Sequence, residues 1–99
     1  MERNDYQNAF LQHIADLQEI SVECVLSQHK LYEHNDYEKI RKALFDVTSE
    51  MIYMIMETID GYSTFTSDKL DIINTKTGKR LKEEPFIELH DAVFDFIKN

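Results

Sequence analysis

The chain has 99 residues and a net charge of −8, from 19 Asp and Glu against 11 Lys and Arg. This length predicts a single domain, residues 1–99, with one hydrophobic core. A hydrophobic content of 42% excludes an intrinsically disordered chain. The negative charge disfavours nucleic acid and anionic membranes as partners, and it favours a basic protein surface.

The cysteine content and the lengths of the apolar runs indicate the cellular compartment of the protein. The one cysteine, Cys24, cannot form an intramolecular disulfide and is typical of a reducing environment. Met1 is followed by charged and polar residues rather than by the apolar segment of a secretory signal. The longest mainly apolar run, residues 51–56, is far shorter than the roughly 20 residues that span a bilayer. We therefore expect a cytoplasmic protein without a membrane partner.

Residues 5–28 are predicted to form the first helix, with two apolar stripes. The wider stripe is assigned to the core: Tyr6, Phe10, Ile14, Leu17, Cys24 and Val25. A narrower stripe lies more than a quarter turn away: Leu11, Ala15, Val22 and Leu26. Either two neighbours pack on this helix, or one stripe is left for a partner.

The same helix carries an acidic stripe. No Lys or Arg occurs in residues 4–28, and four carboxylates share one side of the helix: Asp5, Asp16, Glu19 and Glu23. A solvated face that keeps the protein soluble is one interpretation. The lack of lysines at i, i+4 and the apolar residues beside the stripe favour a docking face instead.

Residues 29–35 are predicted to be a loop, with Asn35 or Asp36 as the N-cap of a second helix over residues 37–60. Gly61 suits the left-handed position that ends a helix. Steps of 4, 3, 4 and 3 residues separate the members of its apolar stripe: Ile40, Leu44, Val47, Met51 and Met54. Further apolar residues flank it: Phe45, Ile52, Ile55 and Ile59. This wide apolar face predicts the central helix of the domain.

Residues 70–82 are predicted to form a β-hairpin around a turn at 75–78 that ends in Gly78. Pro85 is expected to open a last helix over residues 85–98. The apolar residues expected to pack in these two elements are Leu70, Ile72 or Ile73, Leu81, Phe86, Leu89, Val93, Phe94 and Ile97. The predicted fold class is mainly α: a three-helix bundle with a short β-hairpin inserted between the second and third helices.

No catalytic residue, metal site or cofactor is predicted. The four histidines, at positions 13, 29, 34 and 90, show no i, i+3 or i, i+4 pair, and the chain lacks a CxxC motif. His90 and Asp91 are adjacent on a helix, where neighbouring side chains point about 100° apart. Basic residues between Lys69 and Lys82 give the hairpin a positive charge, which we attribute to protection of strand edges rather than to nucleic-acid binding. The sequence does not predict an enzyme.

A resemblance to known proteins adds an expectation. The C-terminal half resembles small bacterial proteins of unassigned function, through Met51, Gly61-Tyr62, Leu70-Asp71-Ile72-Ile73, Thr77-Gly78 and Leu89-His90-Asp91. In size and charge the chain resembles immunity proteins that neutralise polymorphic or contact-delivered toxins. The resemblance implies a stoichiometric inhibitor in the cytoplasm of the toxin-producing cell, with a nuclease as one candidate target. It identifies no functional residue.

The predicted function is a non-enzymatic protein-binding module, in its most concrete form an immunity protein that neutralises a cognate bacterial toxin. Asp16, Glu19 and Glu23 are expected to steer a basic partner. The predicted buried contacts with the partner come from Leu26, Tyr53 and Tyr62. The alternative is a homo-oligomeric structural or regulatory domain, in which Leu11, Ala15, Val22 and Leu26 meet their symmetry mates in a homodimer.

Overall fold

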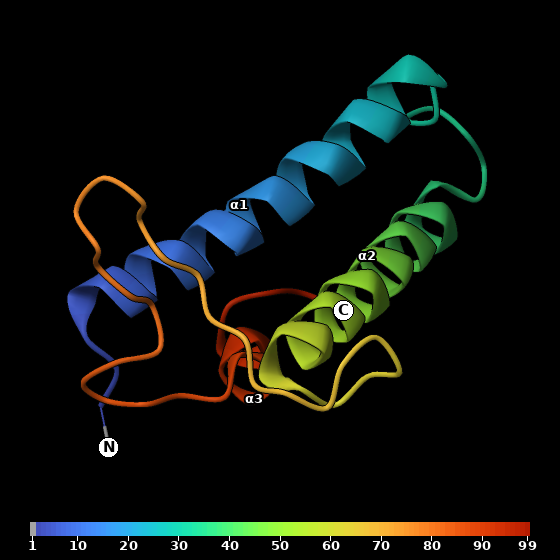
Figure 1. Cartoon of the computed structure of the whole chain (residues 1–99). Helices are drawn as coiled ribbons and strands as arrows, with labels where there is room; N and C mark the ends of the chain where they lie inside the picture. The colour runs from blue at the N-terminus through green and yellow to red at the C-terminus, as the bar shows by residue number, and fades with distance from the viewer. Residues whose placement is uncertain (1) are drawn as a thin grey trace.

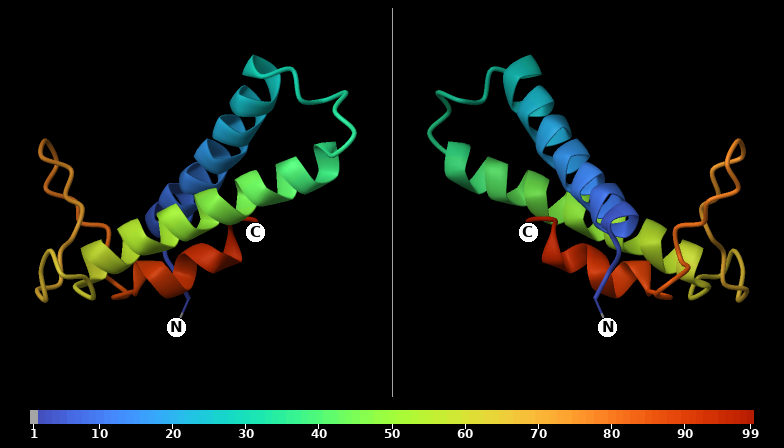
Figure 2. Two further views of the ribbon diagram at one scale, coloured as in Figure 1. Left: turned by 90° about the vertical axis from the view of Figure 1, so that its right-hand side faces the viewer. Right: turned by 90° about the vertical axis from the view of Figure 1, so that its left-hand side faces the viewer.

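A computed structural model describes residues 2–99, and its architecture is mainly helical (Figure 1). The long helices α1 (Asp5–Gln28) and α2 (Tyr37–Asp60) have the predicted bounds, and α3 (Leu89–Ala92) continues as a 3-10 turn, η1 (Val93–Asp95). In Figure 2, α1 and α2 form an open V whose arms are joined by the loop between them. The C-terminal segment lies against α2 on the side away from the upper end of α1. Within residues 2–99, no helix is long and apolar enough to cross a membrane.

Local signals explain where the long helices begin and end. Asn4 and Gln7 form a reciprocal capping box: Gln7 N–H donates to Asn4 Oδ1 at 2.8 Å, and Asn4 N–H donates to Gln7 Oε1 at 2.9 Å. Of the two predicted N-cap residues of α2, Asn35 and Asp36, the structure has Asp36 at this position, but its side chain makes no capping hydrogen bond. Gly61 ends α2 with φ of +90°, and a Cβ there would lie 2.7 Å from Asp68 O. Glycine is therefore required at this position.

Replacing Asn4 with alanine is expected to lower the free energy of unfolding by about 1 kcal/mol, because Gln7 N–H would lose its cap. Asn4 also donates to the carbonyl oxygens of Glu83 and Glu84, so the same change loosens the attachment of α1 to that segment. Urea unfolding followed by circular dichroism measures the change. Asn35→Ala, in the exposed loop, is the control, and an equal loss in both variants would contradict the capping role.

The fully buried face of α1 is the narrower of the two predicted stripes. The assignment of the wider stripe to the core is only partly confirmed, because Tyr6, Phe10 and Ile14 pack against the core while Leu17 and Cys24 are exposed. The buried residues of α1 are Gln7, Leu11, Ala15, Gln18, Val22 and Leu26. The two glutamines extend the narrow stripe along the whole helix, at steps of 4, 4, 3, 4 and 4 residues. Gln7 Nε2 donates to Leu81 O at 2.9 Å and to Pro85 O at 2.6 Å, so this buried amide satisfies carbonyl groups of a distant segment.

The predicted apolar face of α2 is also only partly in the core, against which Ile40 and Leu44 of the stripe and the flanking Ile52 and Ile59 pack. The buried residues of α2 are Phe45, Ser49, Met56 and Asp60, whereas Val47, Met51 and Met54 of the predicted core stripe are exposed. The core has two parts. One lies where α1, α2 and the C-terminal segment meet, and the other fills the V near the loop, where Val22, Leu26 and Phe45 pack together.

The predicted β-hairpin is wrong. Within residues 2–99 the structure has no β-strand, and only a single antiparallel bridge joins Ile73 to Arg80. The turn itself is present, with Gly78 at φ of +76°. Next to the bridge, Leu81 N–H donates to Ile72 O at 3.0 Å, but the return bond is missing because Ile72 N–H donates to Asp71 Oδ1 at 2.7 Å and Leu81 O accepts from Gln7 Nε2 at 2.9 Å. Leu81 is buried as expected, and of the alternatives Ile72 and Ile73 it is Ile72 that packs against the core, whereas Leu70 is exposed.

The last helix is much shorter than the predicted range of 85–98. Glu88, immediately before α3, has extended backbone angles, and Pro85 lies outside the helix. The helix begins at Leu89 because the side chain of Asp60 accepts the backbone N–H of His90 at 2.8 Å. Leu89, Val93 and Ile97 are buried as predicted, whereas Phe86 and Phe94 are exposed.

Candidate functional site: an apolar groove between α1 and α2

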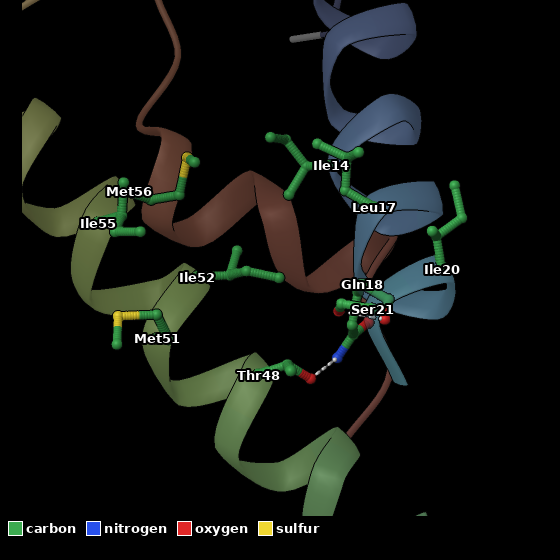
Figure 3. Close-up of a pocket in the computed structure, with 10 residues that line it drawn as sticks. All are labelled: Ile14, Leu17, Gln18, Ile20, Ser21, Thr48, Met51, Ile52, Ile55 and Met56. Carbon is green, nitrogen blue, oxygen red and sulfur yellow. Dashed lines mark hydrogen bonds between the residues drawn. The ribbon is translucent and has the colours of Figure 1, made fainter. Parts of the chain in front are cut away.

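An open groove of about 510 Å³ lies between the two long helices (Figure 3). In Figure 3 one wall comes from α1, the other from α2, and the ribbon of the C-terminal segment passes behind them. The residues that line the groove are Ile14, Leu17, Gln18, Ile20, Ser21, Thr48, Met51, Ile52, Ile55 and Met56. Most of these side chains are apolar, which is typical of sites that bind ligands or partners.

The walls of the groove are exposed to a degree that is unusual for large apolar side chains. On α1, Leu17 is 46% exposed and Ile20 is 57% exposed; on α2, Met51 is 55% exposed and Ile55 is 47% exposed. These residues are neighbours around one groove rather than scattered single side chains. A contiguous exposed apolar surface of this kind marks an interaction site.

Gln18 fixes one end of the groove. Its Nε2 donates to Thr48 Oγ1 at 3.1 Å, as Figure 3 shows, and also to the carbonyl oxygens of Phe45 at 3.3 Å and Lys98 at 2.5 Å. Its Oε1 accepts from Lys98 N–H at 2.8 Å. One buried amide therefore joins α1, α2 and the C-terminus. The two walls of the groove are held at this point without any bound partner.

The outer edge of the α2 wall is acidic. Glu50 lies three residues after Val47 and four before Met54, and Glu57 lies three residues after Met54, so both carboxylates border the exposed stripe. The ion pairs found within residues 2–99 include neither Glu50 nor Glu57. On the α1 side, residues 4–28 contain no Lys or Arg. The exposed apolar stripe of α2 beside the groove thus has a negatively charged border.

The acidic stripe predicted for docking lies elsewhere on α1. Asp16 and Glu19 border a small hollow beside Lys98, whose Nζ is 2.5 Å from Glu19 Oε1. Glu23 accepts hydrogen bonds from Tyr32 and Arg41, and these bonds lower the pKa of its carboxyl group. Two of the predicted docking charges are therefore already balanced within the molecule.

The structure places the three predicted apolar anchors in different environments. Leu26 is 0% exposed, so the prediction that it contacts a partner is wrong for this fold. Tyr53 and Tyr62 come together around His90, with ring centroids 5.8 Å and 5.1 Å from the imidazole. Tyr62 is exposed, and its hydroxyl group donates to Glu88 at 3.1 Å. The acceptance of this hydrogen bond by a carboxylate raises the pKa of Tyr62.

A buried charged cluster was missed by sequence reasoning. Asp60 Oδ1 accepts from Lys82 Nζ at 2.7 Å, and Asp60 Oδ2 lies 2.5 Å from His90 Nδ1. The side chains of Asp60 and Lys82 are 0% and 2% exposed. Burial alone would raise the pKa of Asp60, but hydrogen bonds from His90, Lys82 and Leu89 outweigh it, and the pKa falls below its ordinary value.

Asp60, Glu88 and His90 bring possible metal ligands within 4.8 Å of one another. Their charges are already matched, because Lys82 pairs with Asp60 and Lys69 Nζ lies 3.3 Å from Glu88 Oε1. The contact between Asp60 and His90 is a direct hydrogen bond. These contacts favour a structural role, in which the cluster joins the end of α2 to the segment that leads into α3.

Comparison with known proteins adds no relative on which to base a function. No protein-family model, curated protein or solved structure matches this chain.

Proposed function

We propose that the chain is a non-enzymatic protein-binding module and that the groove between α1 and α2 is its docking surface. One observation carries the proposal: of the six large apolar residues that are exposed on the two long helices, four line a single groove, namely Leu17, Ile20, Met51 and Ile55. The floor of the groove belongs to the core through Ile14, Ile52 and Met56, but the four exposed side chains pack against neither part of the core. Binding of a partner would remove this apolar surface from water.

A protein suits this surface better than a small apolar molecule. The exposed stripe continues past the groove on α2 to Val47 and Met54, which a small ligand in the groove would leave uncovered. Its members Val47, Met51 and Met54 are separated by 4 and 3 residues, a spacing typical of a helix that packs against another helix.

Toxin neutralisation is the more specific form of this proposal. It is supported by the net charge of −8, which would attract a basic toxin, and by the resemblance in size and charge to immunity proteins. Under this proposal, a strain that lacks the gene is inhibited by neighbouring cells of its parent strain, and the wild-type chain restores its growth. A Met51→Glu chain produced at the same level should fail to restore it.

The homodimer that the sequence left open cannot use the predicted surface. Leu11, Ala15, Val22 and Leu26 are all buried within one molecule. A second copy could reach only another face, and light scattering at high micromolar concentration measures whether it does.

Site-specific photocrosslinking in the native cell tests the docking surface. A benzophenone side chain at Met51, in the groove, is expected to form one prominent crosslink to another protein. The same side chain at Asp46, which is exposed on α2 and paired with Lys42, is the matched control and should not form that crosslink. An Ile55→Glu change should abolish the Met51 crosslink without lowering the melting temperature. Identical crosslinks from both positions would contradict the proposal.

A further inference from the structure

We infer that the groove receives a basic amphipathic helix of the partner protein, an inference that rests on the proposed docking function. The groove lies between two helices that diverge as a V, and a third helix laid between them would complete a helical bundle (Figures 2 and 3). Along α2 the exposed apolar residues run from Val47 to Ile55, about 12 Å at 1.5 Å per residue. A partner helix of two to three turns, at about 5.4 Å per turn, covers them.

The charges beside the exposed stripe of α2 favour a partner helix that carries positive charge. Glu50 and Glu57 border the exposed stripe of α2, and the facing helix α1 offers no Lys or Arg in residues 4–28. Lys39 also lies on the polar side of α2, but it is about three turns away from Glu50. A helix with Lys or Arg beside its apolar face would place cations against the two glutamates.

The same charges disfavour a second copy of this chain. Its α1 could offer no Lys or Arg to Glu50 and Glu57, and its α2 would bring the same two glutamates to the interface. Like charges that face each other across an interface oppose binding. The occupant that fits the border is therefore a different, basic protein.

The methionines of the groove affect how strictly the apolar side chains of the partner are selected. Met51 is exposed at the edge of the groove, and Met56 is buried at its floor. Thioether side chains are flexible and repack around partners of different shape. Charge beside the apolar face should therefore decide selectivity more than the identity of each apolar residue.

Three fluorescent synthetic peptides of about 18 residues, or roughly 27 Å as a helix, test the inference. The first has Leu and Ile at heptad spacing with Lys on both flanks, the second has Glu in place of each Lys, and the third is a scrambled Lys peptide without an apolar face. Fluorescence anisotropy at low salt is expected to show binding of the Lys peptide at least tenfold tighter than that of the other two. Methyl NMR should place it at Met51 and Ile55.

Variants of the chain separate the contribution of apolar contacts to peptide affinity from the contribution of charge. Met51→Glu should weaken the Lys peptide at least tenfold. The double change Glu50→Gln and Glu57→Gln should reduce the preference for the Lys peptide over the Glu peptide severalfold, whereas Glu33→Gln with Glu38→Gln is the matched control and should leave it unchanged.

Each alternative outcome has a definite meaning. Equal binding of the Lys and Glu peptides at Met51 would overturn the basic character of the partner but leave the groove as a helix-docking surface. Binding of neither peptide would overturn the inference, and the Met51 crosslink would then decide separately whether the docking function survives. A dimer that Met51→Glu dissociates would show that a second copy occupies the groove, and the inference would be wrong.

Discussion

Replacing Asp60 with asparagine is expected to lower the free energy of unfolding by about 3–5 kcal/mol, because Lys82 would keep its charge in a buried position without a counterion. The amide also loses the charge that attracts His90. Because Asp60 receives the backbone N–H of His90, the start of α3 should loosen as well. Chemical denaturation measures the loss, and amide hydrogen exchange of residues 89–92 reports the loosening of α3.

The pH dependence of stability is a second measure of how much Asp60 contributes to the free energy of unfolding. Its pKa is lowered in the folded protein from an ordinary value of 3.8, so the unfolded chain binds a proton at a higher pH than the folded chain does. The stabilisation from this group is complete well above pH 4, and it is lost as the pH falls through the pKa of the folded state. Asp60→Asn removes this dependence, so its stability should decline less between about pH 4 and pH 2.

An exposed ion pair gives the matched control. Asp46 Oδ1 lies 3.3 Å from Lys42 Nζ on the surface of α2, and Asp46→Asn should change the free energy of unfolding by no more than about 0.5 kcal/mol. A loss at Asp60 no larger than that at Asp46, together with an unchanged acid transition, would show that the buried cluster contributes little to stability.

The bounds of the two long helices could be predicted from the sequence because local signals determine them. Helical spacing of apolar residues extends through both segments, and Gly61 supplies the left-handed residue that closes α2. The turn at Gly78 follows from the same kind of signal. Each of these features depends on residues close together in the chain, so no knowledge of the tertiary fold is needed.

The choice of the buried face could not be predicted from hydropathy, because buried polar side chains decide it. Gln7 and Gln18 count as polar in any hydropathy pattern, yet they bind carbonyl groups 74 to 80 residues away in the chain. Asp60 and Lys82, separated by 22 residues, pair inside the protein in the same way. These long-range partners also explain why α3 begins at Leu89 rather than near Pro85.

Half of the residues that line the groove were recognised in the sequence but assigned to the core: Ile14, Leu17, Met51, Ile52 and Ile55. Leu17 and Met51 belong to the stripes with the strongest apolar pattern, and this pattern led to their assignment to the core. Apolar periodicity shows that a face is buried against something, but it does not distinguish the protein's own core from the surface of a partner. The unusually wide apolar face of α2 was the one available signal, since a small domain has room to bury only part of such a face.

Two leucines of α1 provide a direct test of which face is the core. Leu26→Ala is expected to lower the free energy of unfolding by about 2–5 kcal/mol, since Leu26 is fully buried against Val22 and Phe45. Leu17→Ala removes the same atoms from a side chain that is 46% exposed, so its loss should be about 1 kcal/mol or less. Both residues lie in the same helix, so the loss of helix propensity is equal and cancels in the comparison.

The effects of the two substitutions on peptide affinity should have the opposite order to their effects on stability. At a temperature where both variants are folded, Leu17→Ala should weaken the Lys-flanked peptide severalfold because Leu17 lines the groove, while Leu26→Ala should leave the affinity unchanged. Denaturation and anisotropy on the same two samples measure both rankings. If Leu17→Ala were the more destabilising change and had no effect on binding, the wider stripe would be core after all. The exposed groove would then be an incorrect description of the folded protein, because one face of α1 cannot be both the main source of stability and free for a partner.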